Sequence, residues 1–262
     1  MDTPTRLPLS VVMIARDEAH RIRRSLGSIA DLAEEVVVVH NDCSDDTERI
    51  AREEFGARTY EHPWQGQRDQ KQIAIDYATR PWVLLLDADE ELSEPLRRSL
   101  VAFIHADDHA LAGAYFARKT RFLGRWITHG DWYPDHVLRL FRQGAGKSGG
   151  GPDHDKVQLA GRAQKLAGDL HHYTADDLES HLQKIPYFSA IFLKRLQDRG
   201  KRWSAVEVAF RACWRFFRCY VIRRGFLDGF PGFYIACYLG FSTLYRYSLL
   251  LEAKLDDERD RA

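Results

Sequence analysis

The sequence has few of the features that mark several common protein classes. Its four cysteines form no Cys-x-x-Cys pair, so we expect neither a structural zinc site nor a disulfide framework. It contains no Walker-type phosphate loop, and no Gly-x-Gly-x-x-Gly motif follows the first apolar run, so a nucleotide kinase or a nicotinamide enzyme loses its main support. The formal net charge is +0, so the overall charge predicts no partner.

Long apolar runs are also missing. A membrane-spanning helix needs about 20 consecutive apolar residues, and the most apolar stretch, residues 226–251, is interrupted by Asp228, Pro231 and Arg246. The N-terminus carries an acid at position 2 and prolines at positions 4 and 8 without a basic segment, so we expect no signal peptide. Together with the few cysteines, this favours a cytoplasmic location.

The first 105 residues alternate between strand-like and helix-like patterns. Four apolar or β-branched runs are typical of strands: 9–15, 34–40, 57–62 and 82–86. Helical spacing lies between them, and the helix after residue 44 is expected to open on a capping box of Asp45 and Glu48. This alternation predicts an α/β fold with a mostly parallel sheet and helices on both faces.

The rest of the chain follows a different pattern. Residues 112–143 predict a strand, an irregular loop and a strand, and the glycine-rich stretch 144–151 precedes two short predicted strands. From residue 176 onward the pattern is helical. We therefore expect a boundary near residue 175 between a sheet-based body and C-terminal helices.

Four acidic side chains follow the predicted strand 82–86 with no turn between: Asp87, Asp89, Glu90 and Glu91. Carboxylates this close repel one another unless a cation lies among them. Ligands of open parallel sheets bind beyond the carboxyl ends of the strands, where Asp87 and Asp89 could share Mg²⁺ or Mn²⁺ with diphosphate oxygens. The alternatives are acids that cap the next helix together with Ser93, or an aspartyl-phosphate phosphatase.

Four ordered stretches, residues 9–29, 34–51, 63–93 and 122–142, resemble the family 2 glycosyltransferases. More narrowly, they resemble the lipopolysaccharide core branch that adds a β-linked glucose to inner-core heptose. The resemblance implies a GT-A fold and inverting transfer from a nucleotide sugar, aided by Mg²⁺ or Mn²⁺. It also implies a catalytic domain at 1–175, with a nucleotide-sugar half at about 1–110 and an acceptor half at about 111–175, followed by a helical region at 176–262.

The same resemblance implies the residues that bind the donor. The expected nucleotide-sugar ligands are Ala15, Arg16, Glu18, His40, Asn41, Lys71, Asp87 and Ala88. Asp89 is expected to hold the metal, and His172 resembles the late histidine that completes the metal or diphosphate site. Three positions depart from the family pattern, which has asparagine, an acid and asparagine where this chain has Asp17, His40 and Gln72.

Inverting transfer needs a base that removes the proton of the acceptor hydroxyl. Asp155, which follows His154 after the glycine-rich stretch, is favoured as this base, and Asp135 is its rival. The alternative for Asp135 is a turn residue after Pro134.

The acceptor is expected to contact three residues: Trp132, Tyr133 and Arg139. The aromatic rings match the apolar faces of sugars, although they could equally be packing residues. Arg139 and Arg142 could neutralise phosphates, or could be solvated at the surface.

The C-terminal region interleaves arginines with aromatic residues between residues 201 and 230. Such helices suit the headgroup layer of an anionic bilayer, whereas the alternative is a helical subdomain that packs on the sheet or forms a dimer. No nucleic-acid module accompanies the arginines, so we expect no nucleic-acid partner. We expect a cytoplasmic enzyme, peripheral on the inner face of the bacterial inner membrane.

The resemblance therefore implies transfer of glucose from UDP-glucose to a lipid-linked saccharide acceptor, the inner-core heptose of lipopolysaccharide. One alternative is a family 2 transferase for another surface polysaccharide. Another is a non-catalytic nucleotide-sugar binding protein at the membrane surface, which the departures at positions 17, 40 and 72 suggest.

Overall fold

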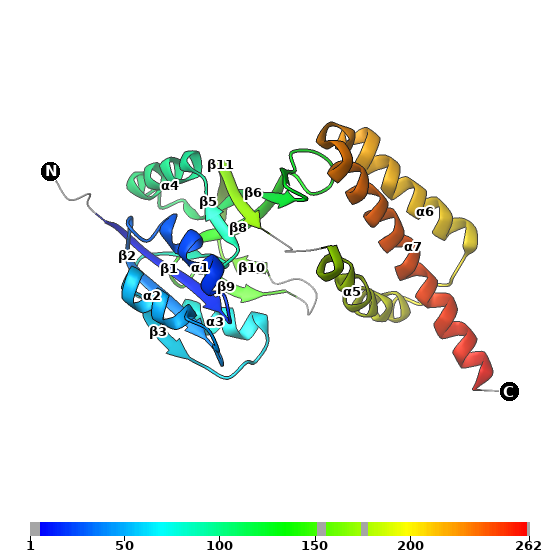
Figure 1. Ribbon diagram of the computed structural model, residues 1–262, viewed down its shortest axis with the longest axis horizontal. Helices are drawn as coiled ribbons and strands as arrows, with labels where there is room; N and C mark the ends of the chain where they lie inside the picture. The colour runs from blue at the N-terminus through cyan, green and yellow to red at the C-terminus, as the bar shows by residue number, and fades with distance from the viewer. Residues whose placement is uncertain (1–5, 151–155, 174–177, 261–262) are drawn as a thin grey trace. The chain divides into compact units, whose positions relative to one another are not determined.

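The computed structural model describes residues 6–150, 156–173 and 178–260, and the chain divides into two compact units (Figure 1). Unit 1 comprises Met1–Lys119 and Asp135–Tyr173, and unit 2 comprises Thr120–Pro134 and Thr174–Ala262. The sequence placed residues 120–134 in the acceptor half, whereas their contacts group them with the C-terminal helices. The functional division at residue 175 stays a prediction.

Unit 1 begins with four parallel strands in the order β3-β2-β1-β4. The strands are β1 (Leu7–Ala15), β2 (Ala33–His40), β3 (Arg58–Glu61) and β4 (Trp82–Leu85). The helices that connect them are α1 (Ala19–Gly27), α2 (Thr47–Phe55) and α3 (Gln67–Asp76). The predicted alternation of strands and helices is confirmed over this part of the chain.

Alternate side chains of the parallel strands enter two separate cores, because successive residues of a strand point to opposite faces. Val11, Met13, Val36 and Val38 pack with α1, α2 and α4 (Glu94–Ala106) on one face. Val12, Val37, Val39 and Leu85 pack on the other face with α3. This burial on both sides explains why β1 and β2 are almost entirely apolar.

Antiparallel strands complete the sheet. Among the described residues it has nine strands, ordered β3-β2-β1-β4-β8-β6-β11-β5 with β7 paired to β6. The added strands are β5 (Glu90–Leu92), β6 (Leu111–Phe122), β7 (Arg125–Trp126), β8 (Asp135–Arg142) and β11 (Arg162–Tyr173). A separate two-stranded antiparallel sheet pairs β9 (Gly146–Gly149) with β10 (Lys156–Leu159). The sheet is therefore mixed rather than mostly parallel as predicted, because β5, β6, β7, β8 and β11 add antiparallel strands beside the four parallel ones.

The expected capping box of α2 is wrong. The helix begins at Thr47, and its N-cap residue is Asp46, whose side chain makes no capping hydrogen bond. The carboxylate of Asp45 instead accepts hydrogen bonds from the backbone N–H of Thr47, at 2.9 Å, and of Ala19, at 3.0 Å. Asp45 thus ties the start of α2 to the start of α1, a contact between distant residues that local spacing does not reveal.

A buried carboxylate on β2 connects three segments of unit 1. Glu35 is 7% exposed and accepts hydrogen bonds from the Ser10 hydroxyl, from the backbone N–H and hydroxyl of Thr79, and from Arg58. Burial alone would raise the pKa of Glu35, but the hydrogen bonds from Ser10, Thr79 and Arg58 outweigh it and hold the pKa below its ordinary value. The ionised carboxylate therefore stabilises the fold.

We expect Glu35→Gln to lower the free energy of unfolding by about 2 kcal/mol at neutral pH, because the donors around it lose a charged acceptor. A depressed folded-state pKa gives stability that is present above the unfolded pKa, near 4.5, and is lost as the pH falls through the folded value. The variant should therefore lose less stability than the wild type on acidification below pH 4.5. Urea unfolding across this range measures both effects.

Glu34→Gln is the matched control, because the neighbouring Glu34 is exposed and its one ion pair among the described residues is with Arg80, at 3.3 Å. We expect it to change the free energy of unfolding by under about 0.5 kcal/mol. Equal effects of the two substitutions would contradict the role of the Glu35 network.

The described part of unit 2 contains three α-helices and residues 120–134, an excursion between β6 and β8. The helices are α5 (Leu178–Asp198), α6 (Ala205–Phe217) and α7 (Gly229–Arg259), and a π-helical segment (Arg218–Ile222) and a short 3₁₀ helix (Gly225–Asp228) join α6 to α7. Phe122 and Ile127 of the excursion pack with Cys219, Ile235 and Ala236.

The buried carboxylate of Asp228 fastens the excursion to the helices of unit 2. It accepts hydrogen bonds from the backbone N–H groups of Thr128, at 3.0 Å, and His129, at 2.8 Å, and from the Thr128 hydroxyl, at 2.9 Å. Close packing continues at Gly232, where a Cβ atom would lie 1.9 Å from the carbonyl oxygen of Gly225, so only glycine fits.

Among the described helices, none combines the length and the hydropathy that crossing a membrane requires.

Candidate active site

The predicted site lies in unit 1 at the carboxyl ends of the parallel strands. The backbone N–H of Leu86 donates to the carbonyl of Val12, at 3.0 Å, so β4 stays in register with β1 until Asp87 begins. Parallel strands present their carboxyl ends at one edge, which brings the residues after β1, β2 and β4 together. The four acids after β4 therefore begin where a ligand of this sheet would bind.

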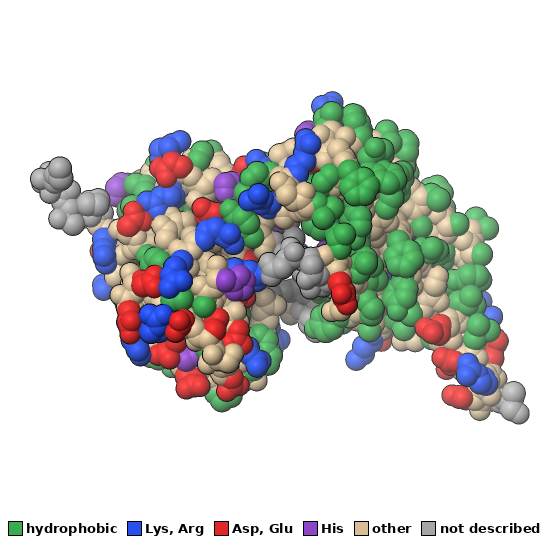
Figure 2. Space-filling view, in the orientation of Figure 1, with side chains coloured by type: hydrophobic (Ala, Val, Ile, Leu, Met, Phe, Trp, Pro, Cys, Tyr) green, Lys and Arg blue, Asp and Glu red, His purple; other side chains and the backbone are tan. Residues whose placement is uncertain are grey.

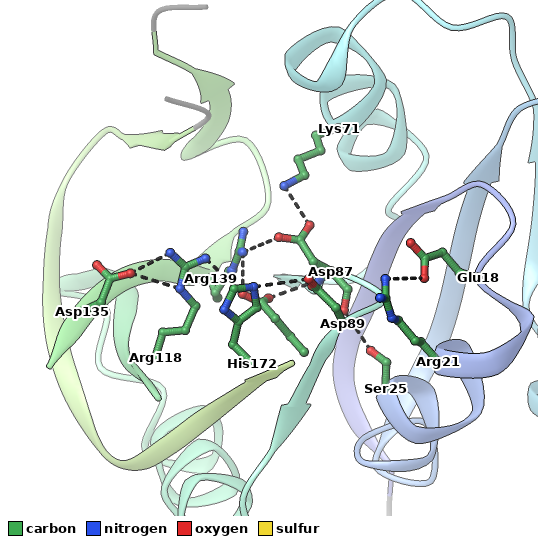
Figure 3. A network of polar contacts seen from close by, with 11 residues as sticks. Glu18, Arg21, Ser25, Lys71, Asp87, Asp89, Arg118, Asp135, Arg139 and His172 are labelled. Carbon is green, nitrogen blue, oxygen red and sulfur yellow. Dashed lines mark hydrogen bonds and ion pairs between the residues drawn. The ribbon is translucent and has the colours of Figure 1, made fainter. Parts of the chain in front are cut away.

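Asp87 is held by two cationic side chains (Figure 3). Its carboxylate lies 2.7 Å from Lys71 Nζ and 2.5 Å from Arg139 Nη2, and its backbone carbonyl accepts a hydrogen bond from the Ser25 hydroxyl at 3.0 Å. Burial would raise the pKa of Asp87, but Arg139 and Lys71 outweigh it and keep the pKa well below the ordinary value. Asp87 is ionised, and the protein itself provides the positive charge beside it.

Glu90 is the buried partner of the same arginine. Arg139 Nη2 lies 2.7 Å from Glu90 Oε1, and the other oxygen of Glu90 accepts from the backbone N–H of Asp87 at 3.2 Å. Arg118 extends the network, 3.7 Å from Glu90 and 2.6 Å from Asp135. The cations expected among these acids therefore include the protein's own Lys71, Arg139 and Arg118.

These contacts correct two alternatives considered from the sequence: that Glu90 and Glu91 cap a helix, and that Arg139 is solvated at the surface. Glu90 and Glu91 do not cap a helix but form β5, which pairs with β11, and only Ser93 caps α4 by accepting from Leu96 N. Arg139 is not solvated at the surface, because it is 7% exposed.

Arg142 lies away from the strand-end acids Asp87 and Glu90, because β8 pairs it with Trp82 at the opposite end of β4. It bonds Asp107 at 2.8 Å and packs over the Trp82 ring. The expected phosphate contact of Arg142 has no support in this position.

Asp89 faces a histidine across the β5–β11 pair. Its Oδ2 atom lies 3.2 Å from His172 Nε2, because the antiparallel register sets Glu90 opposite His172. Burial would raise the pKa of Asp89, but the hydrogen bond from His172 outweighs it and lowers the pKa. The sequence had placed these two residues together as metal ligands, and the structure brings them into contact.

The Asp89–His172 pair fits a divalent cation as part of a larger ligand set. An ionised carboxylate and an imidazole nitrogen are both ligands of Mn²⁺, and carboxylates suit Mg²⁺. Among the described residues, no group of three or more His, Cys, Asp or Glu side chains could hold a metal. Further ligands would have to come from a diphosphate and water.

The residues after β1 and β2 line the expected nucleotide end. Glu18 donates its backbone N–H to the Thr47 hydroxyl at 2.8 Å and pairs with Arg21 at 3.3 Å, and burial raises the pKa of its carboxyl. His40 and Asn41 are buried, and His40 Nδ1 and Asn41 Nδ2 have no hydrogen-bond partner among the described residues. Buried polar atoms without partners call for an explanation, which a bound ligand would supply.

Other predicted nucleotide ligands hold less specific positions. Ala15 ends β1, the exposed Arg16 lies beside Asp17 at 3.9 Å, and Ala88 is buried between the two strand-end aspartates.

Two departures from the family pattern have structural explanations. Asp17 has a φ of 53°, and its carboxylate accepts from the backbone N–H of Ser44, at 2.7 Å, and from the Ser44 hydroxyl, at 2.9 Å. The amide of Gln72 bonds Asp76 and accepts from the backbone N–H of Ser148, which anchors β9 to α3. Both residues shape loops around the strand ends.

The acceptor and base candidates divide among different parts of the chain. Trp132 and Tyr133 belong to unit 2, where the Trp132 ring packs edge-on against the Phe122 ring, with 5.2 Å between the ring centres. Asp155, with His154, lies outside the described residues. Asp135 accepts two hydrogen bonds from Arg118, at 2.6 and 3.0 Å.

The sequence argument missed Arg118, and it named Glu90 among the strand-end acids without predicting its burial or its contact with Arg139. Arg118 shares a face of β6 with the buried Phe116 and Thr120, so strand alternation could have indicated that it points inward. Glu90 gave no such signal, because its burial depends on Arg139 from a strand about fifty residues later.

Comparisons with known proteins show which family the chain resembles over most of its length. The family model described as glycosyl transferase family 2 matches residues 10–158. A protein of Rickettsia felis named uncharacterized glycosyltransferase is 30% identical over 263 residues, covering 94% of this chain and 90% of that protein. The lipopolysaccharide core biosynthesis glycosyltransferase LpsC of Rhizobium meliloti is 25% identical over 265 residues, covering 96% and 97%. Among solved structures, Staphylococcus aureus TarS 1–349 in complex with UDP-GlcNAc is similar at 14% identity and a TM-score of 0.48, covering 95% and 92%.

The mixed sheet, with its acidic strand end and the family match over residues 10–158, defines a transferase of the GT-A fold. The chain belongs to glycosyl transferase family 2. The predicted family and fold class are thereby confirmed, while the roles of individual site residues stay predictions.

Proposed function

We propose that this glycosyltransferase is a metal-dependent, inverting enzyme that moves glucose from UDP-glucose to a lipid-linked saccharide, the inner-core heptose of lipopolysaccharide. The observation that carries the proposal is the ionised Asp89 facing His172 at the end of the parallel strands, beside an Asp87 fixed by Lys71 and Arg139. The relative from Rhizobium meliloti, similar over nearly its whole length, supports the acceptor class.

In this proposal the strand-end residues bind the donor. The uridine would lie against Glu18, His40 and Asn41, where two buried polar atoms have no hydrogen-bond partner within the described part of the chain. Asp89 and His172 would hold Mg²⁺ or Mn²⁺ together with the diphosphate. When bound, the cation stabilises the negative charge that develops on the departing diphosphate.

Asp87 would act from a fixed position. Lys71 and Arg139 keep its carboxylate ionised and in one orientation, so it can accept hydrogen bonds from the ribose or orient the diphosphate. Arg139, expected at the acceptor, would act by holding Asp87 and Glu90 in place. Arg118 would in turn fix the position of Asp135.

The acceptor hydroxyl would lose its proton to Asp155 as it attacks the anomeric carbon in a single displacement. Trp132 and Tyr133 remain our candidates for sugar contacts. The helical region 176–262 would bring the enzyme to the anionic inner membrane, where a lipid-linked acceptor would be anchored.

Release of UDP from a panel of UDP-sugars, with a lipid-linked heptose acceptor present, tests this function. We expect the highest kcat/KM with UDP-glucose, and loss of turnover with EDTA that is reversed by Mg²⁺ or Mn²⁺. Turnover that persists in EDTA would contradict the metal dependence. Tight nucleotide binding without turnover of any donor would favour the non-catalytic binding protein.

A further inference from the structure

A pocket within unit 2 is separate from every residue assigned above to catalysis or donor binding. It has a volume of about 390 Å³ and is lined by side chains of α5, α6, α7 and the π-helical segment. α6 and α7 lie side by side along much of their length (Figure 1). Four arginines line the pocket: Arg211, Arg215, Arg218 and Arg246. None of its lining residues among the described part of the chain is acidic.

The positive charge of this arginine pocket is only partly compensated. Arg215 and Arg218 share Asp131, at 3.1 and 2.7 Å, which also meets Arg223 at 3.2 Å. Arg211 shares Glu207 with Lys201. Two carboxylates are thus shared among five cationic side chains, and Arg246 adds a sixth positive charge. Burial lowers the pKa of Arg215, and although Asp131 opposes this, repulsion from Arg218 and Arg246 adds to it.

Among the four arginines that line the pocket, Arg246 has the least compensated charge. It has no ion pair within the described residues, and its buried Nε atom has no hydrogen-bond partner there. Its guanidinium lies 5.6 Å from the centre of the Phe192 ring, which supports it without neutralising it. A buried donor of this kind calls for an acceptor that the described residues do not supply.

An exposed apolar stripe runs beside the pocket. On α6 and the turn after it, large apolar side chains recur every three or four residues, so they share one face. These residues are Val206, Phe210, Trp214, Phe217 and Val221, with exposed fractions of 81, 66, 47, 46 and 43%. α7 adds exposed Phe230, Phe233, Phe241 and Leu244, and Figure 2 shows hydrophobic side chains gathered over these helices. Trp214 belongs both to the stripe and to the pocket lining.

We propose that the arginine pocket binds the phosphate group of a bilayer lipid while the apolar stripe enters the headgroup boundary. Guanidinium groups present paired donors that match phosphate oxygens, and several of them around one pocket favour an anion over any neutral ligand. The adjoining apolar stripe favours a lipid as the source of that phosphate, because a lipid bilayer would bury these exposed apolar side chains and a soluble anion would not. The inference rests on the proposed membrane contact and adds a specific site to it.

Flotation of the full chain with vesicles tests the proposal. We expect binding to phosphatidylcholine vesicles that contain phosphatidate, and little binding to phosphatidylcholine alone. Arg246→Gln should weaken binding to the phosphatidate vesicles about tenfold, the effect of one lost charge-assisted hydrogen bond. The substitution breaks no ion pair among the described residues, so the thermal unfolding midpoint of the variant should match that of the wild type.

Arg199→Gln is the matched control, since Arg199 is exposed in unit 2 and lies outside the pocket lining. It removes the same charge and should weaken binding less than about twofold. Arg246→Lys, which keeps the charge but not the planar donors, should restore part of the affinity. Equal losses for Arg246→Gln and Arg199→Gln would overturn the pocket while leaving general membrane contact intact.

The two proposals can fail separately. A protein that binds none of the vesicles would overturn the inference and the membrane contact, whereas UDP release with a detergent-dispersed acceptor still reports on catalysis. Tight binding of inorganic phosphate by a protein that ignores every vesicle would assign the pocket to a soluble anion and would also overturn the inference.

Discussion

Asp89→Asn is expected to lower kcat about a thousandfold, because the amide cannot replace the charge that the proposed cation requires. The substitution keeps the size of the side chain, and Asp89 follows β4 rather than lying within it, so stability should change by under about 1 kcal/mol. Steady-state kinetics at the Mg²⁺ or Mn²⁺ concentration that saturates the wild type measure the loss. High Mn²⁺ should recover part of the rate, since affinity for the ion is what the variant has lost.

Asp76→Asn provides the control for this experiment. Asp76 is an exposed carboxylate on α3 that accepts a hydrogen bond from Gln72, so its loss should leave kcat within about twofold. Near-normal turnover of Asp89→Asn under the same conditions would show that the cation, if one is needed, is held elsewhere.

The second large effect is expected at the base. Asp155→Asn should lower kcat about a thousandfold, the range for removal of a general base, and should leave the dissociation constant of UDP unchanged. Asp135→Asn should cost about tenfold or less, because Asp135 is engaged by two hydrogen bonds from Arg118 and would act through that arginine. Single-turnover rates and UDP titrations separate chemistry from binding.

The reverse ranking of the two variants would assign the base to Asp135. The pH profile of kcat/KM provides an independent readout, since loss of the base should remove the acidic limb that the wild type shows. A variant that loses UDP binding together with kcat would indicate a structural role instead.

The parallel part of the fold was predictable because its signals are local. β1, β2 and β4 are continuous apolar runs, and each strand-to-helix alternation fits within about thirty residues. The position of Asp87 and Asp89 at a strand end follows from the same local pattern. The start of α1 does not follow from this pattern: the helix begins at Ala19, because Asp17 adopts a left-handed backbone conformation after β1.

The charge network around those acids was only partly predictable. A cation was expected there, but the identity of Arg139 and Arg118 depends on β8 pairing with β4 and with β6, which sets Leu140 opposite both Leu84 and Ala114. No periodicity in the sequence specifies that register. His172 was anticipated through family resemblance, and its contact with Asp89 arises from the β5–β11 pairing.

The membership of residues 120–134 in unit 2 could not be read from the sequence either. It depends on hydrogen bonds from Thr128 and His129 to Asp228, about one hundred residues away along the chain. The basic and aromatic character of the C-terminal helices was visible, but the gathering of four arginines around one pocket requires the packing of α5, α6 and α7.

Anomalous diffraction from a crystal containing Mn²⁺ and UDP tests the central claim most directly. The account predicts a manganese peak within coordination distance of the Asp89 carboxylate and His172, with diphosphate oxygens as further ligands. A site in which UDP is bound, Asp89 keeps its contact with His172 and manganese is absent or bound elsewhere would contradict it.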